Sequence, residues 1–217
     1  NAHSVLAGPD GVLHVAWSAV RDGNDEILYR RSTDEGASWS AETVLARGIN
    51  VTGEELNNAG ANPALAASGS NVYVVWRGDE KSGGNKSRLG EIHFIRSSDS
   101  GLSWGAPVRI TDAPGLSASP SIAAAGNDIH LVWVDLRGGD VEEIYYKVSR
   151  DGGETWSDDL PLVTQTGLPK GQPTVEVSGA LVIVSWMDFR DGNWEIYYKR
   201  SMDAGKSWSE DLRFTFD

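Results

Sequence analysis

Two charged phrases in the second half of the chain hold the residue types best suited to bind or transform a ligand. Each phrase has a Trp, an Asp two residues later and an Arg two residues after that, which gives Asp135 with Arg137 and Asp188 with Arg190. An arginine binds a carboxylate through two parallel hydrogen bonds, and two carboxylates about 5–10 Å apart can hydrolyse a glycosidic bond. We therefore expect these four residues to bind an anionic or sugar ligand.

The same phrases also have a purely structural explanation. In each repeat a Glu opens the hydrophobic run that follows the phrase, at Glu26, Glu91, Glu143 and Glu195. An Arg and a Glu on opposite sides of a hairpin mouth pair readily, so this interpretation predicts a ring of hairpin salt bridges. Two earlier copies of the phrase are incomplete, because Ala19 precedes Arg21 and because Gly78 and Glu80 occupy the two slots of the second copy. Repetition of the phrase favours the structural interpretation.

Trp194 is the one tryptophan that the repeats do not explain. It lies in the short turn 191–194, next to Arg190. An indole at a loop can stack on the apolar face of a sugar ring, or it can cover a neighbouring hairpin. Trp194 is therefore the fifth candidate ligand-binding residue, and both explanations stay open.

A repeated unit must position these residues. The pattern Ser-x-Asp-x-Gly-x-Ser/Thr-Trp occurs four times, around Asp34, Asp99, Asp151 and Asp203, which are 65, 52 and 52 residues apart. Around each copy, short runs rich in Val, Ile, Tyr and Trp alternate with Gly/Asn/Asp turns, which is typical of strands. The sequence predicts four four-stranded antiparallel meanders in a single domain 1–217, at about 3–46, 62–111, 119–164 and 172–215.

Each component of the eight-residue pattern can serve local folding. The Gly supplies a positive φ at the bend, and the Asp accepts hydrogen bonds from the N–H groups of the turn. The Trp buries a large apolar ring against the base of the hairpin. We therefore expect the four pattern aspartates to be structural and not catalytic.

The four patterns resemble the Asp-box, also called the bacterial neuraminidase repeat, and the resemblance covers essentially the whole chain. It implies an all-β fold of the sialidase-like superfamily, a β-propeller of four-stranded antiparallel blades with the first strand of each blade innermost. Families with this repeat include sialidases, endoglucanases, lectins and receptor ectodomains, so the resemblance implies a fold more than an activity. Four blades could close alone, form an eight-bladed ring with a second copy, or belong to a larger ring.

A sialidase of this type would need three arginines around a carboxylate, a Tyr–Glu nucleophile pair, an Asp acid and a Phe/Tyr-Arg-Ile/Leu-Pro motif. The chain lacks that motif, and its only Arg-Ile pair, Arg109-Ile110, is followed by Thr111. The catalytic residues are therefore unknown, and we expect a non-catalytic extracellular or periplasmic module that binds a glycan or protein. The alternatives are a sialidase-like glycoside hydrolase or a fragment of one, and a self-assembling propeller fragment without a ligand.

Composition excludes several other classes of function. The net charge of the 217 residues is −12, which disfavours nucleic acid and anionic membranes as partners. The chain has no Cys, so disulfides and thiolate sites are impossible. His14 and His130 occupy matching positions where other repeats have Tyr73 and Ile183, so we expect packing residues, no metal site and no cofactor.

Two insertions distinguish the second repeat from the others. They lengthen the connection 48–60 and the loop 77–88. In a meander, both connections lie at the end opposite the pattern hairpins, together with the charged phrases. Loops held by a rigid scaffold often carry binding residues, but long surface loops are also tolerated at little cost.

Overall fold

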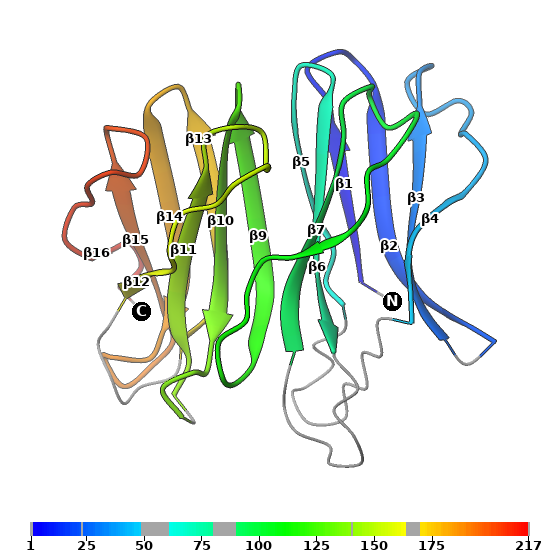
Figure 1. Cartoon of the computed structure of the whole chain (residues 1–217). Coiled ribbons are helices and arrows are strands. Elements are labelled where there is room, and N and C mark those ends of the chain that lie inside the picture. Colours follow the sequence, from blue (N-terminus) through cyan, green and yellow to red (C-terminus); the bar gives the residue numbers. More distant parts are fainter. Residues whose placement is uncertain are drawn as a thin grey trace. The chain divides into compact units, whose positions relative to one another are not determined.

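The computed structural model describes residues 2–22, 24–48, 61–79, 90–139, 141–163 and 170–216. The regular structure of these residues is entirely β, with sixteen strands in four antiparallel sheets (Figure 1). Within the described ranges, nothing forms a helix long and apolar enough to cross a membrane. The chain divides into two compact units, Asn1–Ala113 and Pro114–Asp217, each with two sheets. That the four sheets form a single domain stays a prediction.

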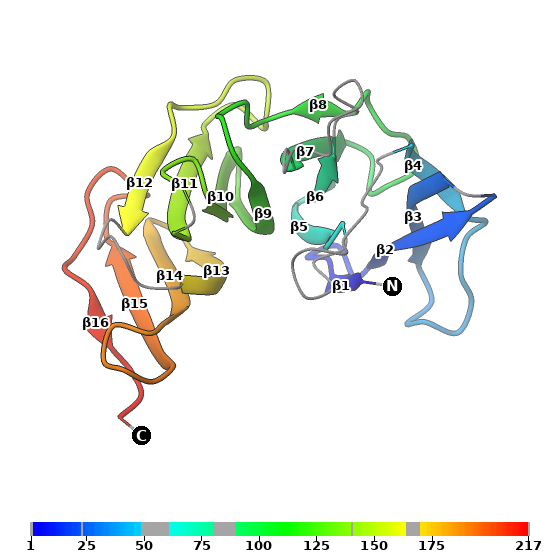
Figure 2. The same ribbon diagram turned by 90° about the horizontal axis from the view of Figure 1, so that it is seen from below.

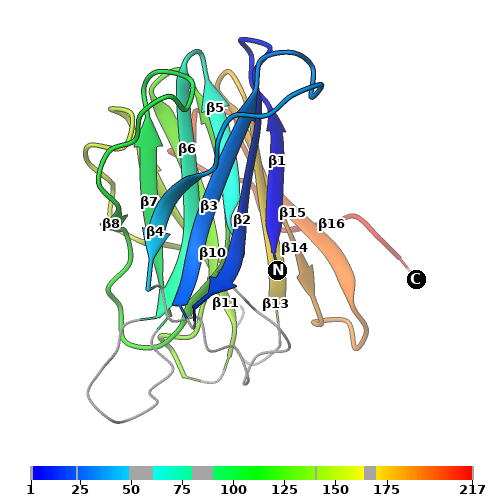
Figure 3. The same ribbon diagram turned by 90° about the vertical axis from the view of Figure 1, so that its right-hand side faces the viewer.

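The first unit contains sheets 1 and 2. The strands of sheet 1 are β1 (His3–Ala7), β2 (Leu13–Arg21), β3 (Asn24–Ser32) and β4 (Thr43–Arg47), side by side in that order (Figure 3). The strands of sheet 2 are β5 (Ala64–Ser68), β6 (Asn71–Asp79), β7 (Gly90–Ser97) and β8 (Val108–Arg109). Each strand pairs with the next one along the chain, as expected for a meander.

The second unit contains sheets 3 and 4. The strands of sheet 3 are β9 (Ser117–Ala125), β10 (Asp128–Asp135), β11 (Glu143–Ser149) and β12 (Leu160–Val163). The strands of sheet 4 are β13 (Lys170–Ser178), β14 (Leu181–Asp188), β15 (Glu195–Ser201) and β16 (Leu212–Arg213). The first strands of the two sheets, β9 and β13, lie side by side (Figure 2).

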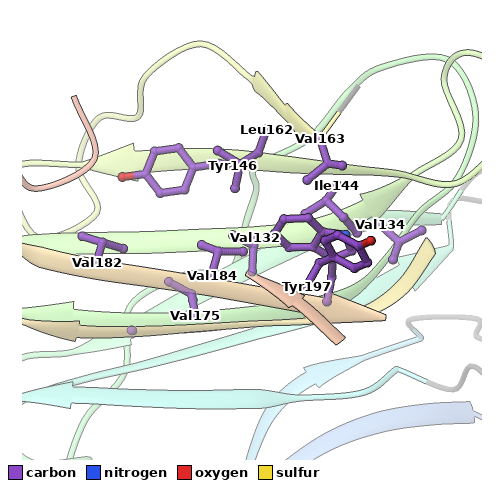
Figure 4. Close-up of a cluster of buried hydrophobic side chains, with 12 residues drawn as sticks. Val132, Val134, Ile144, Tyr146, Leu162, Val163, Val175, Val182, Val184 and Tyr197 are labelled. Atoms are coloured by element: carbon purple, nitrogen blue, oxygen red, sulfur yellow. The ribbon is translucent and has the colours of Figure 1, made fainter. Parts of the chain in front are cut away.

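Alternation of side chains along the second strand of each sheet builds the cores. On β14, Val182, Val184 and Trp186 point to one face and are almost fully buried, whereas Ile183 on the opposite face is 38% exposed. The buried face of β14 meets Val132, Val134, Ile144 and Tyr146 of sheet 3 in one apolar cluster (Figure 4). A corresponding cluster around Trp76 joins sheets 1 and 2. Burial of these β-branched and aromatic side chains is the main force that holds each pair of sheets together.

Antiparallel pairing places the two kinds of connection at opposite ends of every sheet. In sheet 3, β10 ends at Asp135 opposite Glu143, while β11 ends at Ser149 opposite Ile129. The pattern hairpin follows Ser149, so it lies at the end away from Asp135. We call the end with Asp135, and its equivalent in the other sheets, the rim. The charged phrases lie at the rim, as expected from the meander.

Candidate functional site

The four pattern hairpins share one set of hydrogen bonds. In each, the first Ser donates its hydroxyl to Asp Oδ1 at 2.7–2.8 Å and accepts the Gly N–H at 2.7–2.9 Å. The Ser or Thr four residues after the Asp donates its N–H to Oδ1 and its hydroxyl to Oδ2. These bonds lower the pKa of Asp34, Asp99 and Asp151 to about 2. The carboxylates therefore hold the turns together, which is the structural role that the sequence indicates.

At the rim of sheet 3, Asp135 is the centre of a closed network. Its Oδ2 accepts hydrogen bonds from Trp133 Nε1 at 2.8 Å, Arg137 Nη2 at 2.8 Å and Ser117 Oγ at 3.1 Å. Its Oδ1 accepts from the backbone N–H and Nε of Arg137 at 2.8 and 2.9 Å. Burial by itself would raise the pKa of Asp135, but the bonds from Arg137 and Trp133 outweigh it and hold the pKa below its usual value.

Arg137 is fixed on its other sides as well. Its Nη2 lies 2.7 Å from Asp159 Oδ2, and Lys147 Nζ lies 2.7 Å from the other oxygen of the same carboxylate. The guanidinium carbon lies 4.0 Å from the ring centroid of Tyr145, a cation–π contact. The Arg137 side chain is 22% exposed and that of Asp135 is 1% exposed. Arg137 therefore presents one edge to solvent from a rigid frame.

Sheet 4 repeats most of this network, with Lys170 in place of Ser117 and without the bond from the arginine Nε. Asp188 Oδ2 accepts hydrogen bonds from Trp186 Nε1 at 2.9 Å and Arg190 Nη2 at 2.6 Å, and Oδ1 accepts from the Arg190 N–H at 3.0 Å. Arg190 Nη1 lies 2.8 Å from Asp211, and its guanidinium lies 4.2 Å from the Tyr197 ring centroid. Because two different sequences build the same frame, it belongs to the repeated architecture.

The salt bridges of the rim differ from the expected Arg–Glu pairs. Arg137 and Arg190 each pair with two aspartates, one at the end of the preceding strand and one three residues after the pattern Trp. In sheet 1, where Ala19 replaces the first Asp, Arg21 pairs with Glu42 at the equivalent of the second position. Salt bridges therefore form at the rim as the structural interpretation predicts, but with different partners. That Asp135, Arg137, Asp188 and Arg190 also contact a ligand stays a prediction.

Glu195, which was expected to pair with Arg190, has its own partners. The carboxylate is 1% exposed and accepts hydrogen bonds from Asn193 Nδ2 at 2.7 Å and Arg213 Nη2 at 2.6 Å. Thr215 Oγ1 donates to its second oxygen. The bond from Thr215, with those from Asn193 and Arg213, lowers the pKa of Glu195 in spite of burial. These bonds anchor the turn that carries Trp194.

Trp194 lies at the rim of sheet 4 with 47% of its surface exposed. Its ring meets Phe189 edge-to-face, with centroids 5.4 Å apart. Phe189 belongs to the same turn, so the indole is steadied from one side while much of its surface stays open to solvent. This geometry suits a stacking platform.

Sequence reasoning missed two residues at the rim of the second unit. Lys170, the first residue of β13, is fully buried and pairs in register with Asp188. Glu142 lies just before β11, where burial raises its pKa although the Lys170 backbone N–H and charge act in the opposite direction. A carboxyl with a raised pKa beside a buried lysine is a candidate acid. The only sequence signal is that Lys170 corresponds to Ser117 in sheet 3, and that the loop before Glu143 is one residue longer than its counterpart.

The two histidines are packing residues in this structure. His14 Nδ1 lies 2.6 Å from Tyr29 Oη, and His130 Nδ1 lies 2.7 Å from Tyr146 Oη. Both rings are fully buried, which lowers the pKa of His14 and lowers that of His130 to about 4. Among the described residues no group of three or more His, Asp or Glu side chains could hold a metal ion. Residues 49–60 and 80–89, which include most of the two insertions 48–60 and 77–88, lie outside the described residues.

Comparison with known proteins relates this geometry to one fold. A family model described as BNR/Asp-box repeat matches residues 147–158, which include the third pattern. No curated protein sequence matches the chain. Among solved structures, the chain is similar to a Trypanosoma rangeli sialidase in complex with the inhibitor DANA, with 19% identity and a TM-score of 0.59, over 96% of this chain and 37% of the sialidase.

Two other solved structures match over a larger part of their own length. One is a protein of unknown function from Dyadobacter fermentans, with 16% identity, a TM-score of 0.69 and coverage of 99% of this chain and 68% of that one. The other is an α-L-arabinanase from Penicillium chrysogenum in complex with arabinobiose, with 17% identity, a TM-score of 0.60 and coverage of 99% and 66%.

Together these findings confirm the predicted fold class. The chain is an all-β, sialidase-like propeller built from four-stranded antiparallel blades, and it carries a BNR/Asp-box repeat. It spans well under half of the length of the sialidase that it resembles. Since the identities are below 20% here, the likeness concerns the fold, and activity must be argued from the rim itself.

Proposed function

We propose that the rim of the second unit binds a carbohydrate without hydrolysing it. The ligand-binding set is Asp135, Arg137, Asp188, Arg190 and Trp194, with the aspartates acting through the arginines that they orient. Carbohydrate sites combine an aromatic platform for the apolar face of a sugar with fixed polar groups around it. Trp194 and the solvent-facing edges of the two arginines offer this combination. We expect the carbohydrate ligand to lie outside the cytoplasm, so an extracellular or periplasmic location is part of the proposal.

The observation that carries the proposal is the exposed indole of Trp194. A ring that is 47% exposed leaves apolar surface in water, which burial elsewhere would avoid. The turn that holds it is fixed by the buried bonds of Glu195 and by the edge-to-face contact with Phe189. A fixed platform loses little conformational entropy when a sugar stacks on it, and this favours binding.

The repeated aspartates are poorly suited to catalysis. A general acid in a glycosidase needs a raised pKa so that it carries a proton near neutral pH. Asp135 and Asp188 instead have lowered pKa values, since bonds from Arg137, Arg190 and the two tryptophans outweigh the effect of burial. Both carboxylates are also only 1% exposed, so neither can reach a glycosidic bond without breaking its frame.

Glu142 favours a second candidate function, glycoside hydrolysis. Burial raises its pKa, which is the property that Asp135 and Asp188 lack. Two of the similar solved structures are a sialidase and an α-L-arabinanase, which makes sialosides and arabinosides the substrates to test. In this alternative Glu142 donates a proton to the leaving oxygen.

One pair of measurements separates the two functions. Binding to a glycan array, followed by titration calorimetry with the best glycan, should fall at least tenfold for Trp194→Ala and much less for Trp194→Tyr. Leu102→Ala, which removes a 70% exposed side chain in the first unit, is the matched control and should bind normally. Unchanged binding by Trp194→Ala would contradict the proposed site. Release of a fluorogenic aglycone from sialosides or arabinosides, lost in Glu142→Gln, would establish the hydrolase instead.

A further inference from the structure

The two sheets of each unit are joined by a contact that we call the tyrosine joint. In the first unit, Tyr29 of β3 packs edge-to-face on Trp104, the pattern Trp of sheet 2, with ring centroids 4.8 Å apart. A Cβ atom added to the pattern glycine Gly101 would lie 1.9 Å from Tyr29 Oη, so the hydroxyl fills the space that this glycine leaves. Arg31, two residues after the tyrosine, donates from Nη1 to the Ser100 carbonyl at 2.7 Å.

The second unit contains the same joint between sheets 3 and 4. Tyr146 of β11 packs edge-to-face on Trp208, with centroids 5.0 Å apart. A Cβ atom on Gly205 would lie 2.0 Å from Tyr146 Oη. The arginine comes from another position here, and Arg150 donates to the Ala204 carbonyl, which is the counterpart of the Ser100 carbonyl. Each joint therefore has a tyrosine and an arginine on one side, and a pattern hairpin on the other.

Within the first unit, sheet 1 has the hairpin side of this joint, and no described tyrosine of that unit fills it. Among the described residues, only Leu13 Cδ1 at 3.5 Å and Trp39 at 3.9 Å lie within 4 Å of the position of a Cβ atom on the pattern glycine Gly36. Trp39 is 40% exposed. The φ of Glu35 is 58°, close to the 55° of Ser100 and the 59° of Ala204, so its carbonyl is presented in the same way.

Within the first unit, the face of sheet 1 beside this hairpin is also left uncovered by the described residues. Leu13, Val15 and Trp17 are only half-buried, whereas their counterparts in sheet 2, Val72, Val74 and Trp76, are at most 1% exposed in the core of the first unit. Val5 of β1, paired with Val15, is 66% exposed. In sheets 2 and 4, the corresponding apolar face is covered by the preceding sheet of the same unit.

Sheet 4 presents the opposite, tyrosine side. Tyr198 and Arg200 lie three residues and one residue before the pattern Ser201, the positions that Tyr29 and Arg31 have before Ser32. On the same face of β14, Ile183 is 38% exposed where its counterpart in sheet 3, His130, is fully buried. Among the described residues, the one aromatic ring that packs on Tyr198 is that of Phe214, which meets it edge-to-face and is itself 69% exposed.

We infer that Tyr198 and Arg200 of one copy of this chain dock on the hairpin of Gly36 and Trp39 of a second copy. The ring of Tyr198 packs on Trp39, its hydroxyl enters the space at Gly36, and Arg200 donates to the Glu35 carbonyl. The partner is a second copy because the chain carries both halves of a contact that it already makes twice, with the same residue types. Such a head-to-tail contact is heterologous, and two of them can close a ring of two copies.

Crosslinking tests this contact directly, because the native chain has no Cys. Arg200→Cys and Glu35→Cys chains with different tags are mixed at micromolar concentration and treated with a short bismaleimide. We expect a crosslinked product that contains both tags, and a dimeric mass for the native chain by light scattering. The same mixture with Tyr198→Ala, or with Gly36→Ala in the other chain, should lose at least four fifths of that product.

Three outcomes would overturn the inference. They are a monomeric mass without a two-tag product, a two-tag product that survives both joint substitutions, and a crosslink within one monomeric chain that carries both cysteines. The last outcome would mean that the chain itself occupies the hairpin. Circular dichroism and thermal unfolding check that each variant is folded, and Gly36→Ala keeps the test valid if Tyr198→Ala does not fold. Glycan binding at Trp194 is measured separately, so failure of one proposal leaves the other intact.

Discussion

At the residue scale, the rim aspartates could contact a ligand directly or could hold the arginines in place. The number of hydrogen bonds that Asp135 accepts favours the second role. Asp135 accepts five hydrogen bonds, from Trp133, Ser117 and three donor groups of Arg137. Neither of its oxygens is therefore left free to react with a ligand. A carboxylate in that position orients an arginine. The sequence predicted salt bridges of Arg137 with a Glu, and it could not reveal Asp159, because that partner follows the hairpin 22 residues after Arg137.

Replacing Asp135 tests this structural role. Asp135→Ala leaves the Arg137 guanidinium and the Trp133 indole N–H without their main acceptor in a buried site. Loss of one partner of a buried pair costs about 3 kcal/mol or more in the free energy of unfolding. Urea unfolding of the variant should show this loss, whereas Asp158→Ala, which removes an exposed carboxylate nearby, should change the free energy by less than about 0.5 kcal/mol. Full stability of Asp135→Ala together with lost glycan binding would return Asp135 to a direct ligand role.

At the element scale, local patterns determine the strands, whereas contacts between sheets depend on positions far apart in the sequence. The short β-branched and aromatic runs and the Gly turns predicted the meanders, since strand alternation and turn geometry are encoded within a few residues. Pattern aspartates could be assigned a structural role for the same reason. The tyrosine joint could not be predicted in this way, because Tyr29 and Gly101 are 72 residues apart.

A matched pair of glycine substitutions measures the joint. Gly205 and Gly36 have φ values of 86° and 88°, so an alanine at either position meets the same unfavourable backbone conformation. Only at Gly205 must the new methyl group also displace Tyr146 Oη, which would lie 2.0 Å away. We expect Gly205→Ala to lose about 1–3 kcal/mol more than Gly36→Ala in dilute solution, where any association is absent. Equal losses in thermal unfolding would mean that the tyrosine does not depend on the glycine.

At the scale of the whole molecule, repetition predicted the architecture, whereas three residues at the rim of the second unit depart from the repeat. Four similar hairpins and four similar sheets follow from one motif, so the fold was accessible from a single sequence. Trp194, Glu142 and Lys170 are departures, and only the first was recognisable, because an extra tryptophan is conspicuous. Glu142 and Lys170 gain their properties from burial, which no local pattern encodes.

The repeats also predict how stability depends on pH across the molecule. Burial depresses the pKa of His130 from 6.5 to about 4, so the unfolded chain takes up a proton that the folded chain excludes, and stability falls as the pH is lowered through this range. The pattern aspartates behave differently. Hydrogen bonds depress the pKa of Asp34, Asp99 and Asp151 from 3.8 to about 2, and lower that of Asp203 too, so their contribution is complete above about pH 4 and is lost as the pH falls toward 2.

Two acid-sensitive stages should therefore appear when the midpoint of urea unfolding is followed from pH 7 to pH 2. His130→Ile, which introduces the residue that sheet 4 has at Ile183, should weaken the stage between about pH 6.5 and 4 and leave the lower one. His3→Ala, at an exposed position of β1, is the control for removal of one histidine. Asp151→Asn should weaken the lower stage alone, since it removes one of four similar carboxylates. A midpoint that is constant from pH 7 to 4 in the native chain would contradict the assignment of His130 as a buried neutral imidazole.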